Sequence, residues 1–264
     1  MLTTDYVPGT PNWLDLGAPD IDAAVDFYTG VFGWTFQSAG PEAGGYGFFQ
    51  LDGRDVAAAG PLMGEGAEPS WTLYFHTDDA DATAEDVERN GGTLRAGPMD
   101  VFSAGRLAQF TDPTGADFAV WQPGDVAGLD VVMDEHTLCW AELYTTDAER
   151  AKEFYSAVLS WSYESMSAGE MTYHVASAPG GGTEEDSSHG GIMQLPRENL
   201  AAGSSSEWHP YFAVTDCDAV HDTATRRGAR SLMPPTDVPA VGRLAMLNDP
   251  FGATFALIKG DPTR

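Results

Sequence analysis

Two histidines and an acid in the second half of this chain are of the types that perform acid–base or metal chemistry. Glu142, His174 and His209 could bind a divalent metal as a facial set of two imidazoles and one carboxylate. Glu142 and His209 alone could act as an acid–base pair, if the fold brings both within reach of one substrate proton. Asp15 and His76 form a weaker counterpart in the first half. The alternative for all five is a polar lining that binds water or a ligand.

Two arginines, Arg106 and Arg243, each follow a glycine. They could clamp a carboxylate or another ligand oxygen, or they could bridge to acids such as Asp112 and Asp249 or to backbone carbonyls. The sequence has no Ser-His-Asp order, no nucleophile elbow and no phosphate-binding loop. Nucleophilic and nucleotide chemistry therefore receive no support.

The elements that must position these residues repeat along the chain. One block of aromatic and acidic residues returns 127 residues later, as from Trp13 to Trp140, and a second returns 137 residues later, as from Arg106 to Arg243. A shift of ten residues between two aligned blocks indicates a duplicated domain whose second copy has gained a loop. We therefore expect two domains, residues 1–124 and 138–264, joined by a linker at residues 125–137.

The pattern of each copy predicts the order strand, helix, strand, strand, strand, and this order occurs two times within the copy. Residues 13–17 alternate as a strand does, and Asp20 then precedes apolar residues at helical spacing over residues 21–32, which Gly33 ends. Short strand candidates separated by glycine and proline turns follow. We expect four βαβββ modules, at about residues 11–65, 70–122, 138–195 and 207–260. The glycine-rich residues 179–191 predict a mobile loop.

Four such modules, the Phe27-Tyr28 pair on the first helix, and the turns Asp112-Pro113-x-Gly and Asp249-Pro250-x-Gly resemble the vicinal-oxygen-chelate superfamily, with its glyoxalase, bleomycin-resistance and extradiol-dioxygenase members. The resemblance covers roughly residues 11–260. It implies an α+β fold whose modules form two tandem glyoxalase-like domains with cupped mixed sheets, each cup holding a ligand. Residues 9–16 are also similar to an actinobacterial subgroup labelled glyoxalase-like or hydroxylase-like, with some members that help anthracycline biosynthesis.

The resemblance places one face of each first strand in a cup, and strand alternation then predicts an aromatic lining with a few acids and histidines. Family enzymes hold a divalent metal at positions that here carry Trp13, Thr72, Ala119, Trp140, His209 and Ala256. One histidine cannot make such a site, so we expect no metal and no other cofactor. The predicted ligand-binding residues are Trp13, Asp15, Tyr74, His76, Trp121, Trp140, Tyr144, His174, Tyr211, Arg106 and Arg243, and the catalytic candidates are Glu142 and His209.

The composition limits the partners. Forty acidic against thirteen basic residues give a net charge of −27, which repels nucleic acid and anionic membrane surfaces. We expect a cytoplasmic monomer or homodimer without a membrane segment. The leading hypothesis is a metal-free protein that binds an aromatic or polycyclic small molecule, in drug resistance or as a helper in natural-product metabolism. The alternatives are a lyase, isomerase or oxygenase of the same fold, with an acid–base pair or an unorthodox metal site, and a protein-binding scaffold.

Overall fold

The computed structural model describes residues 1–62, 64, 66–168, 171–183 and 186–261. The first copy contains β1 Pro11–Ala18, α1 Ile21–Phe32, β2 Thr35–Ser38, the short 3₁₀ helix η1 Pro41–Ala43, β3 Gly47–Leu51, β4 Arg54–Pro61, β5 Ser70–His76, α2 Ala80–Arg89, β6 Thr93–Val101, β7 Gly105–Thr111 and β8 Asp117–Pro123. The second contains β9 Leu138–Thr145, α3 Ala148–Leu159, β10 Ser162–Ala168, β11 Met171–Ser177, β12 Ser188–Gln194, α4 Arg197–Ala201, β13 Glu207–Ala213, α5 Cys217–Arg226, β14 Arg230–Val238, β15 Gly242–Asn248 and β16 Thr254–Gly260. The predicted module order therefore occurs four times.

The strands form two eight-stranded mixed sheets. Their orders are β2-β3-β4-β1-β5-β8-β7-β6 and β10-β11-β12-β9-β13-β16-β15-β14. In each module the first strand pairs in parallel with the last, and the remaining pairs of the module are antiparallel. The helix between the first and second strands begins the long connection that a parallel pair requires.

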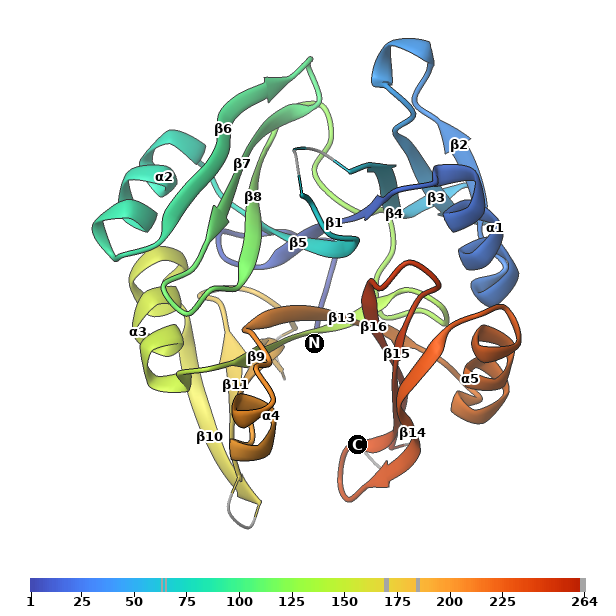
Figure 1. The fold of residues 1–264 in the computed structure, drawn as a ribbon. Coiled ribbons are helices and arrows are strands. Elements are labelled where there is room, and N and C mark those ends of the chain that lie inside the picture. Colours follow the sequence, from blue (N-terminus) through green and yellow to red (C-terminus); the bar gives the residue numbers. More distant parts are fainter. Residues whose placement is uncertain (63, 65, 169–170, 184–185, 262–264) are drawn as a thin grey trace. The chain divides into compact units, whose positions relative to one another are not determined.

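By contacts, the described residues divide into two compact units. One contains residues 1–13, 73–128 and 140–209, and the other contains residues 14–72, 129–139 and those from Pro210 onward. Each unit combines modules from both copies: α2 packs against α3 in the first, and α1 packs against α5 in the second (Figure 1). The predicted boundaries at residues 1–124 and 138–264 follow the sequence copies and stay a prediction, since the compact units cross them.

The four long helices that follow the first strands begin with the same cap. Each is preceded by an aspartate whose carboxylate accepts a hydrogen bond from the backbone N–H three residues on, at 2.9 to 3.0 Å: Asp20, Asp79, Asp147 and Asp216. Such a cap satisfies a backbone donor that the first turn leaves unpaired, and it contributes about 1 kcal/mol. The duplicated aspartates thus fix where each helix starts.

Buried relays of tryptophan, tyrosine and aspartate join modules of different copies. In the second unit, Trp71 Nε1 donates to Tyr28 Oη at 3.0 Å, and Tyr28 donates to Asp249 Oδ2 at 3.1 Å. Asp249 also accepts three backbone N–H groups of its own turn, from Phe251 to Ala253. The first unit repeats the relay with Trp208, Tyr155 and Asp112. The helix tyrosine and the Asp-Pro-x-Gly turn, two motifs far apart in the sequence, are therefore one structural device.

One predicted loop is shorter than expected, and two other segments show features that the sequence did not predict. The loop predicted over residues 179–191 is shorter, because residues 188–194 form β12, and residues 184–185 lie outside the described part. Residues 125–137 pack against the fold, with Leu129, Val131 and Val132 buried. The short helix α4 had no clear signal in the sequence. Among the described residues, no helix has the length and apolar character needed to cross a membrane.

Candidate functional site

The register of three strands defines one face of the second sheet within the first unit. Glu142 on β9 pairs with Gly191 on β12, and Gly191 pairs with Val175 on β11. Because successive strand residues point to opposite faces, Trp140, Tyr144 and Tyr173 share this face with Glu142. The face therefore brings one acid together with three aromatic side chains.

Tyr173 joins Trp140 and Glu142. Trp140 Nε1 donates to Tyr173 Oη at 2.8 Å, and the Tyr173 hydroxyl donates to the Glu142 carboxylate. Burial, followed by the nearby carboxylate, raises the pKa of Tyr173 well above its usual value, so its proton stays on the phenol. Glu142 is only 7% exposed, whereas both aromatic rings are half-buried. A carboxylate is thus held in place among rings that still reach the surface.

Gly191 makes room for this arrangement. β12 lies between β9 and β11, so Tyr173 must cross it to reach the other two residues. A Cβ atom at Gly191 would lie 2.0 Å from Tyr173 Oη, so a side chain there would force the tyrosine to shift. A glycine inside a strand often marks such a close approach.

His209 extends the face from β13. Its ring lies against that of Tyr144, with centroids 5.0 Å apart. Nε2 is 3.1 Å from Glu207 Oε2, although neither ring nitrogen has a partner in hydrogen-bond geometry among the described residues. We call the set Trp140, Glu142, Tyr144, Tyr173 and His209 the Glu142 face.

The first copy holds a related pair in the second unit. Tyr46 Oη donates to Asp15 Oδ1 at 2.6 Å. Both side chains are half-buried, and the pair joins β1 to the residue just before β3. Asp15, which we predicted from the sequence to bind a ligand, therefore has a tyrosine partner, as Glu142 does.

His174 lies on the opposite face of its sheet. It pairs with Ile192, next to Gly191 along β12, so alternation directs it away from the Glu142 face. Its Nδ1 is 2.8 Å from Ser165 Oγ, and its Nε2 is 3.8 Å from Glu149 on α3. Burial, together with Lys152, lowers the pKa of His174. The set of His174, Glu142 and His209 considered from the sequence is not brought together, because adjacent strand residues cannot share a face.

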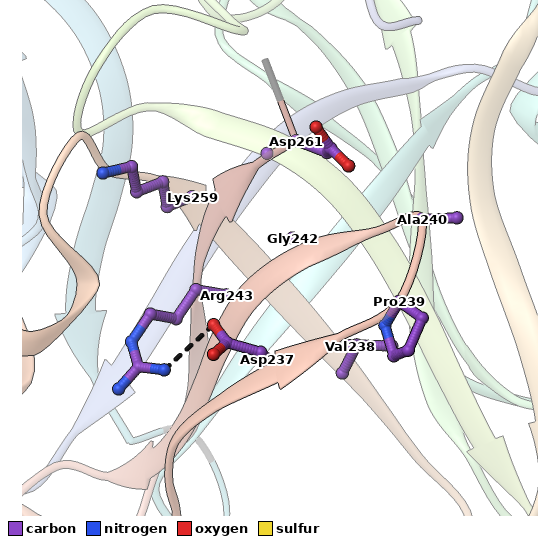
Figure 2. A pocket seen from close by; sticks show the side chains of 9 residues that line it. Asp237, Val238, Pro239, Ala240, Gly242, Arg243, Lys259 and Asp261 are labelled. Carbon is purple, nitrogen blue, oxygen red and sulfur yellow. Dashed lines mark hydrogen bonds and ion pairs between the residues drawn. The ribbon is translucent and has the colours of Figure 1, made fainter. Parts of the chain in front are cut away.

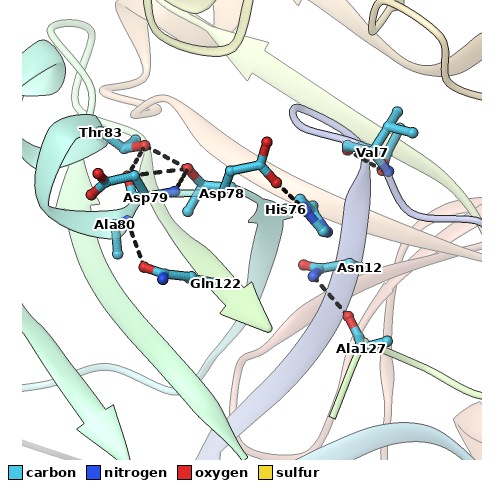
Figure 3. A network of polar contacts seen from close by, with 11 residues as sticks. Val7, Asn12, His76, Asp78, Asp79, Ala80, Thr83, Gln122 and Ala127 are labelled. Carbon is cyan, nitrogen blue, oxygen red and sulfur yellow. Dashed lines mark hydrogen bonds and ion pairs between the residues drawn. The ribbon is translucent and has the colours of Figure 1, made fainter. Parts of the chain in front are cut away.

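The predicted residues of the second module lie on β5 and β8. Tyr74 and Trp121 are buried, and Trp121 Nε1 donates to the Val126 carbonyl at 2.9 Å. His76 pairs with Trp121 across the strands, and its Nε2 lies 3.3 Å from Asp78 in a polar network (Figure 3). His76 also borders a cavity of about 270 Å³ between Gly9 and the end of α3.

Trp13 and Tyr211, two further predicted ligand-binding residues, are buried. Trp13 lies on β1 and Tyr211 on β13. The Tyr211 backbone carbonyl accepts a hydrogen bond from the Cys139 thiol at 3.3 Å. Burial of both rings means that a ligand would meet little of their surface.

Both arginines are held by acids, but the acids differ from those expected. Arg106 binds Asp81 through two nitrogens at 3.0 Å and Asp100 at 2.8 Å. Asp112 and Asp249, the suggested partners, instead belong to the buried relays. Arg243 repeats the arrangement with Asp218 and Asp237. These bonds raise the pKa of both guanidinium groups.

Arg243 also borders an open cavity of about 400 Å³ at the β14–β15 turn, where Figure 2 shows it directed toward Asp237. The cavity includes Lys259 and the backbone of Gly242. Because the guanidinium of Arg243 already donates to Asp218 and Asp237, few of its N–H groups remain to bind a ligand carboxylate.

Tyr173, Tyr46 and Gly191 escaped the sequence reasoning. The dipeptide Tyr173-His174 offers two candidate side chains, of which only one can face a ligand, and the phase of β11 decides which. Gly191 carried the missing signal, since an interior strand glycine suggests that a large side chain crosses it.

Comparison with known proteins agrees with this fold. Residues 10–120 match the Glyoxalase/Bleomycin resistance protein/Dioxygenase superfamily, and residues 138–258 match the family described as Glyoxalase-like domain. The putative glyoxylase CFP32 of Mycobacterium tuberculosis is 38% identical over 98% of this chain and 98% of its own length. The chain belongs to the glyoxalase/bleomycin resistance protein/dioxygenase superfamily. The α+β fold class with two tandem glyoxalase-like domains is therefore confirmed.

Other known proteins are similar over nearly the full length. The anthracycline biosynthesis protein DnrV of Streptomyces peucetius is 38% identical over 97% of this chain and 95% of its own. The crystal structure of 2,2',3-trihydroxybiphenyl 1,2-dioxygenase from Sphingomonas wittichii matches with a TM-score of 0.64 and 15% identity, covering 96% of this chain and 91% of the other. At that identity, the structure shows the fold alone.

The residues at the superfamily's metal positions do not fit a divalent metal. Trp140 fills one position with an indole that is bonded to Tyr173, and Trp13, Thr72, Ala119 and Ala256 supply no carboxylate or imidazole, so that His209 is the single imidazole among the six positions. Of the described histidines, cysteines and acids, no three are grouped so as to hold a metal ion.

Proposed function

We propose that this protein binds a planar aromatic or polycyclic small molecule on the Glu142 face, as a metal-free binding or helper protein in natural-product metabolism. The observation that supports this most directly is the buried carboxylate of Glu142, held by Tyr173 among half-buried aromatic rings. The name of the relative DnrV, an anthracycline biosynthesis protein, points to the same class of ligand.

The face suits such a ligand for two physical reasons. Aromatic rings stack on planar ligands, and each aromatic pair contributes about 0.5–1.5 kcal/mol beyond the burial of area. A carboxylate accepts strong hydrogen bonds from an amine or a hydroxyl group of the ligand. Because Tyr173 already orients Glu142, little side-chain freedom would be lost on binding.

Titration with an anthracycline that carries an amino sugar tests the proposal. Binding should quench tryptophan fluorescence, and Glu142→Gln and Trp140→Ala should each weaken it about tenfold or more. Glu153→Gln removes the same charge from an exposed helix position and should leave the affinity unchanged. If the parent protein binds neither the anthracycline nor other planar polycyclic amines, the proposal fails.

A second candidate function is acid–base catalysis on the same face. Glu142 could accept a proton from a bound substrate, and His209 could return one, because its ring nitrogens have no hydrogen-bond partner within the described structure. Glu142→Gln and His209→Ala should then both abolish a turnover that the parent protein shows. Full activity in both variants would refute this assignment.

Localisation and oligomeric state also belong to the proposal. We place the protein in the cytoplasm as a monomer or homodimer, on the basis of its acidic sequence and the lack of a membrane-crossing helix among the described residues. Light scattering coupled to size-exclusion chromatography would separate monomer from dimer.

A further inference from the structure

We propose that the first copy carries a second binding site for the same class of ligand, built on Asp15 and Tyr46, so that one chain binds two molecules. This inference rests on the proposed function and extends it from one face to both copies. It takes as its ligand a planar aromatic molecule with a cationic amine.

The pair has the geometry of a prepared acceptor. Tyr46 Oη donates to Asp15 Oδ1 at 2.6 Å, a short distance that is typical of a hydroxyl bound to a carboxylate. The bond orients the carboxylate of Asp15 in a half-buried position, and a carboxylate has about four lone pairs, so it can accept more than one hydrogen bond. The Phe48 ring stands edge-on to Tyr46 at 5.7 Å, which adds aromatic surface beside the acid.

The positions of the two pairs are equivalent. Both members shift by the offset of the duplication, since 15 plus 127 is 142 and 46 plus 127 is 173. Each tyrosine reaches its acid across the strand that lies between them, β4 in the first copy and β12 in the second. The two copies therefore retain the pair itself, an acid oriented by a tyrosine.

The glycines that lie beneath the two tyrosines indicate that both copies have kept the acid–tyrosine pair. In the first copy Gly60 lies beneath Tyr46, where a Cβ atom would be 2.9 Å from Cδ2, and in the second Gly191 lies beneath Tyr173. The register shows that these glycines are not equivalent, because Gly191 pairs with Glu142 whereas Ala58 pairs with Asp15. Each copy therefore makes space for its tyrosine ring with a glycine at a different strand position. This indicates that the glycine accommodates the tyrosine and is not simply an equivalent residue of the duplicated strand.

The two sites should differ in strength. Asp15 is half-buried and one methylene shorter than Glu142, which is buried. A more exposed carboxylate attracts a cation less strongly and is screened more by salt. We therefore expect the Asp15 site to be the weaker one and to lose affinity faster as salt is raised.

The test is the stoichiometry of 9-aminoacridine binding, measured by calorimetry and fluorescence in about 150 mM salt, where exposed charges are screened beyond about 8 Å. The whole protein should bind two molecules. Asp15→Asn should remove the weaker site and Glu142→Gln the tighter one, each leaving one molecule bound. Tyr46→Phe, which keeps the ring and the charge, should weaken the first-copy site severalfold by releasing Asp15.

Two controls make the result specific. Asp22→Asn removes an equal charge from an exposed position of α1 in the same unit and should leave both sites intact. Anthraquinone-2-sulfonate, a planar anion, should bind at least about tenfold more weakly than the cation. If the parent protein binds one molecule, and this binding is lost in Glu142→Gln but unchanged in Asp15→Asn, the second site is refuted and the proposed function is not. No binding in the parent protein would overturn the proposed function together with it.

Discussion

Trp140 donates a hydrogen bond to the Tyr173 hydroxyl at 2.8 Å, across a strand on which Gly191 leaves room for the tyrosine. The two residues are 33 positions apart, yet the tyrosine hydroxyl serves both the indole and the Glu142 carboxylate. The Glu142 carboxylate is thus oriented by Tyr173, which is itself held by Trp140.

Tyr173→Phe should destabilise the protein by about 1–3 kcal/mol, because it leaves a half-buried indole N–H and a buried carboxylate without their shared partner. Thermal and urea unfolding measure the loss. In a double-mutant cycle with Trp140→Phe, the two changes should couple by roughly 0.5–3 kcal/mol. Strict additivity would mean that the bond contributes nothing to stability.

Gly191→Ala should disrupt the Glu142 face while the rest of the fold persists. The new methyl group would collide with Tyr173 Oη, so the tyrosine must leave its position. We expect weaker ligand binding and a destabilisation of about 1–3 kcal/mol, typical of overpacking. Gly260→Ala is the matched control, because a Cβ atom there meets open space. Equal effects of the two substitutions would contradict the steric argument.

How far the sequence predicts this protein depends on how local each signal is. Asp20 and its three equivalents mark helix starts because a cap acts within three residues, and the duplication confirms each element twice. Alternation likewise predicts that Glu142 and Tyr144 share a face. The partners of Asp112 and Arg106 were mistaken, since such pairs depend on which modules pack together. The phase of β11, which separates Tyr173 from His174, is set by its pairing with β12.

His189 should make stability depend on pH. Burial, and to a lesser degree the N-terminal amine, lower its pKa to about 3, and its ring lies tilted against that of Trp161, with centroids 4.8 Å apart. Between about 6.5 and 3 the unfolded chain binds a proton that the folded chain refuses, so stability is full above this window and falls as the pH falls through it. The slope should approach about 1.4 kcal/mol per pH unit. His189→Phe should flatten this part of the curve, and an unchanged slope would assign it to other groups.

Arg106→Ala and Arg243→Ala should leave ligand affinity unchanged within about twofold. Each guanidinium is already bonded to two aspartates at a partly exposed position. Water and salt screen exposed ion pairs, so the loss of stability should also be small. Titration of both variants with the anthracycline checks this. A large loss of affinity in either variant would restore the carboxylate-clamp role considered from the sequence.

Residues 1–124 alone should not form a stable monomer. Tyr28 in this fragment would lose Asp249, and Asp112 would lose Tyr155, because each buried relay is completed by a residue of the other copy. The helix faces of α1 and α2 that pack on α5 and α3 would also become exposed. Circular dichroism and light scattering should show an unfolded or self-associated fragment, and co-expression with residues 138–264 should restore a cooperative transition. A monomeric fragment that melts at the temperature of the full chain would instead mean that each copy folds independently.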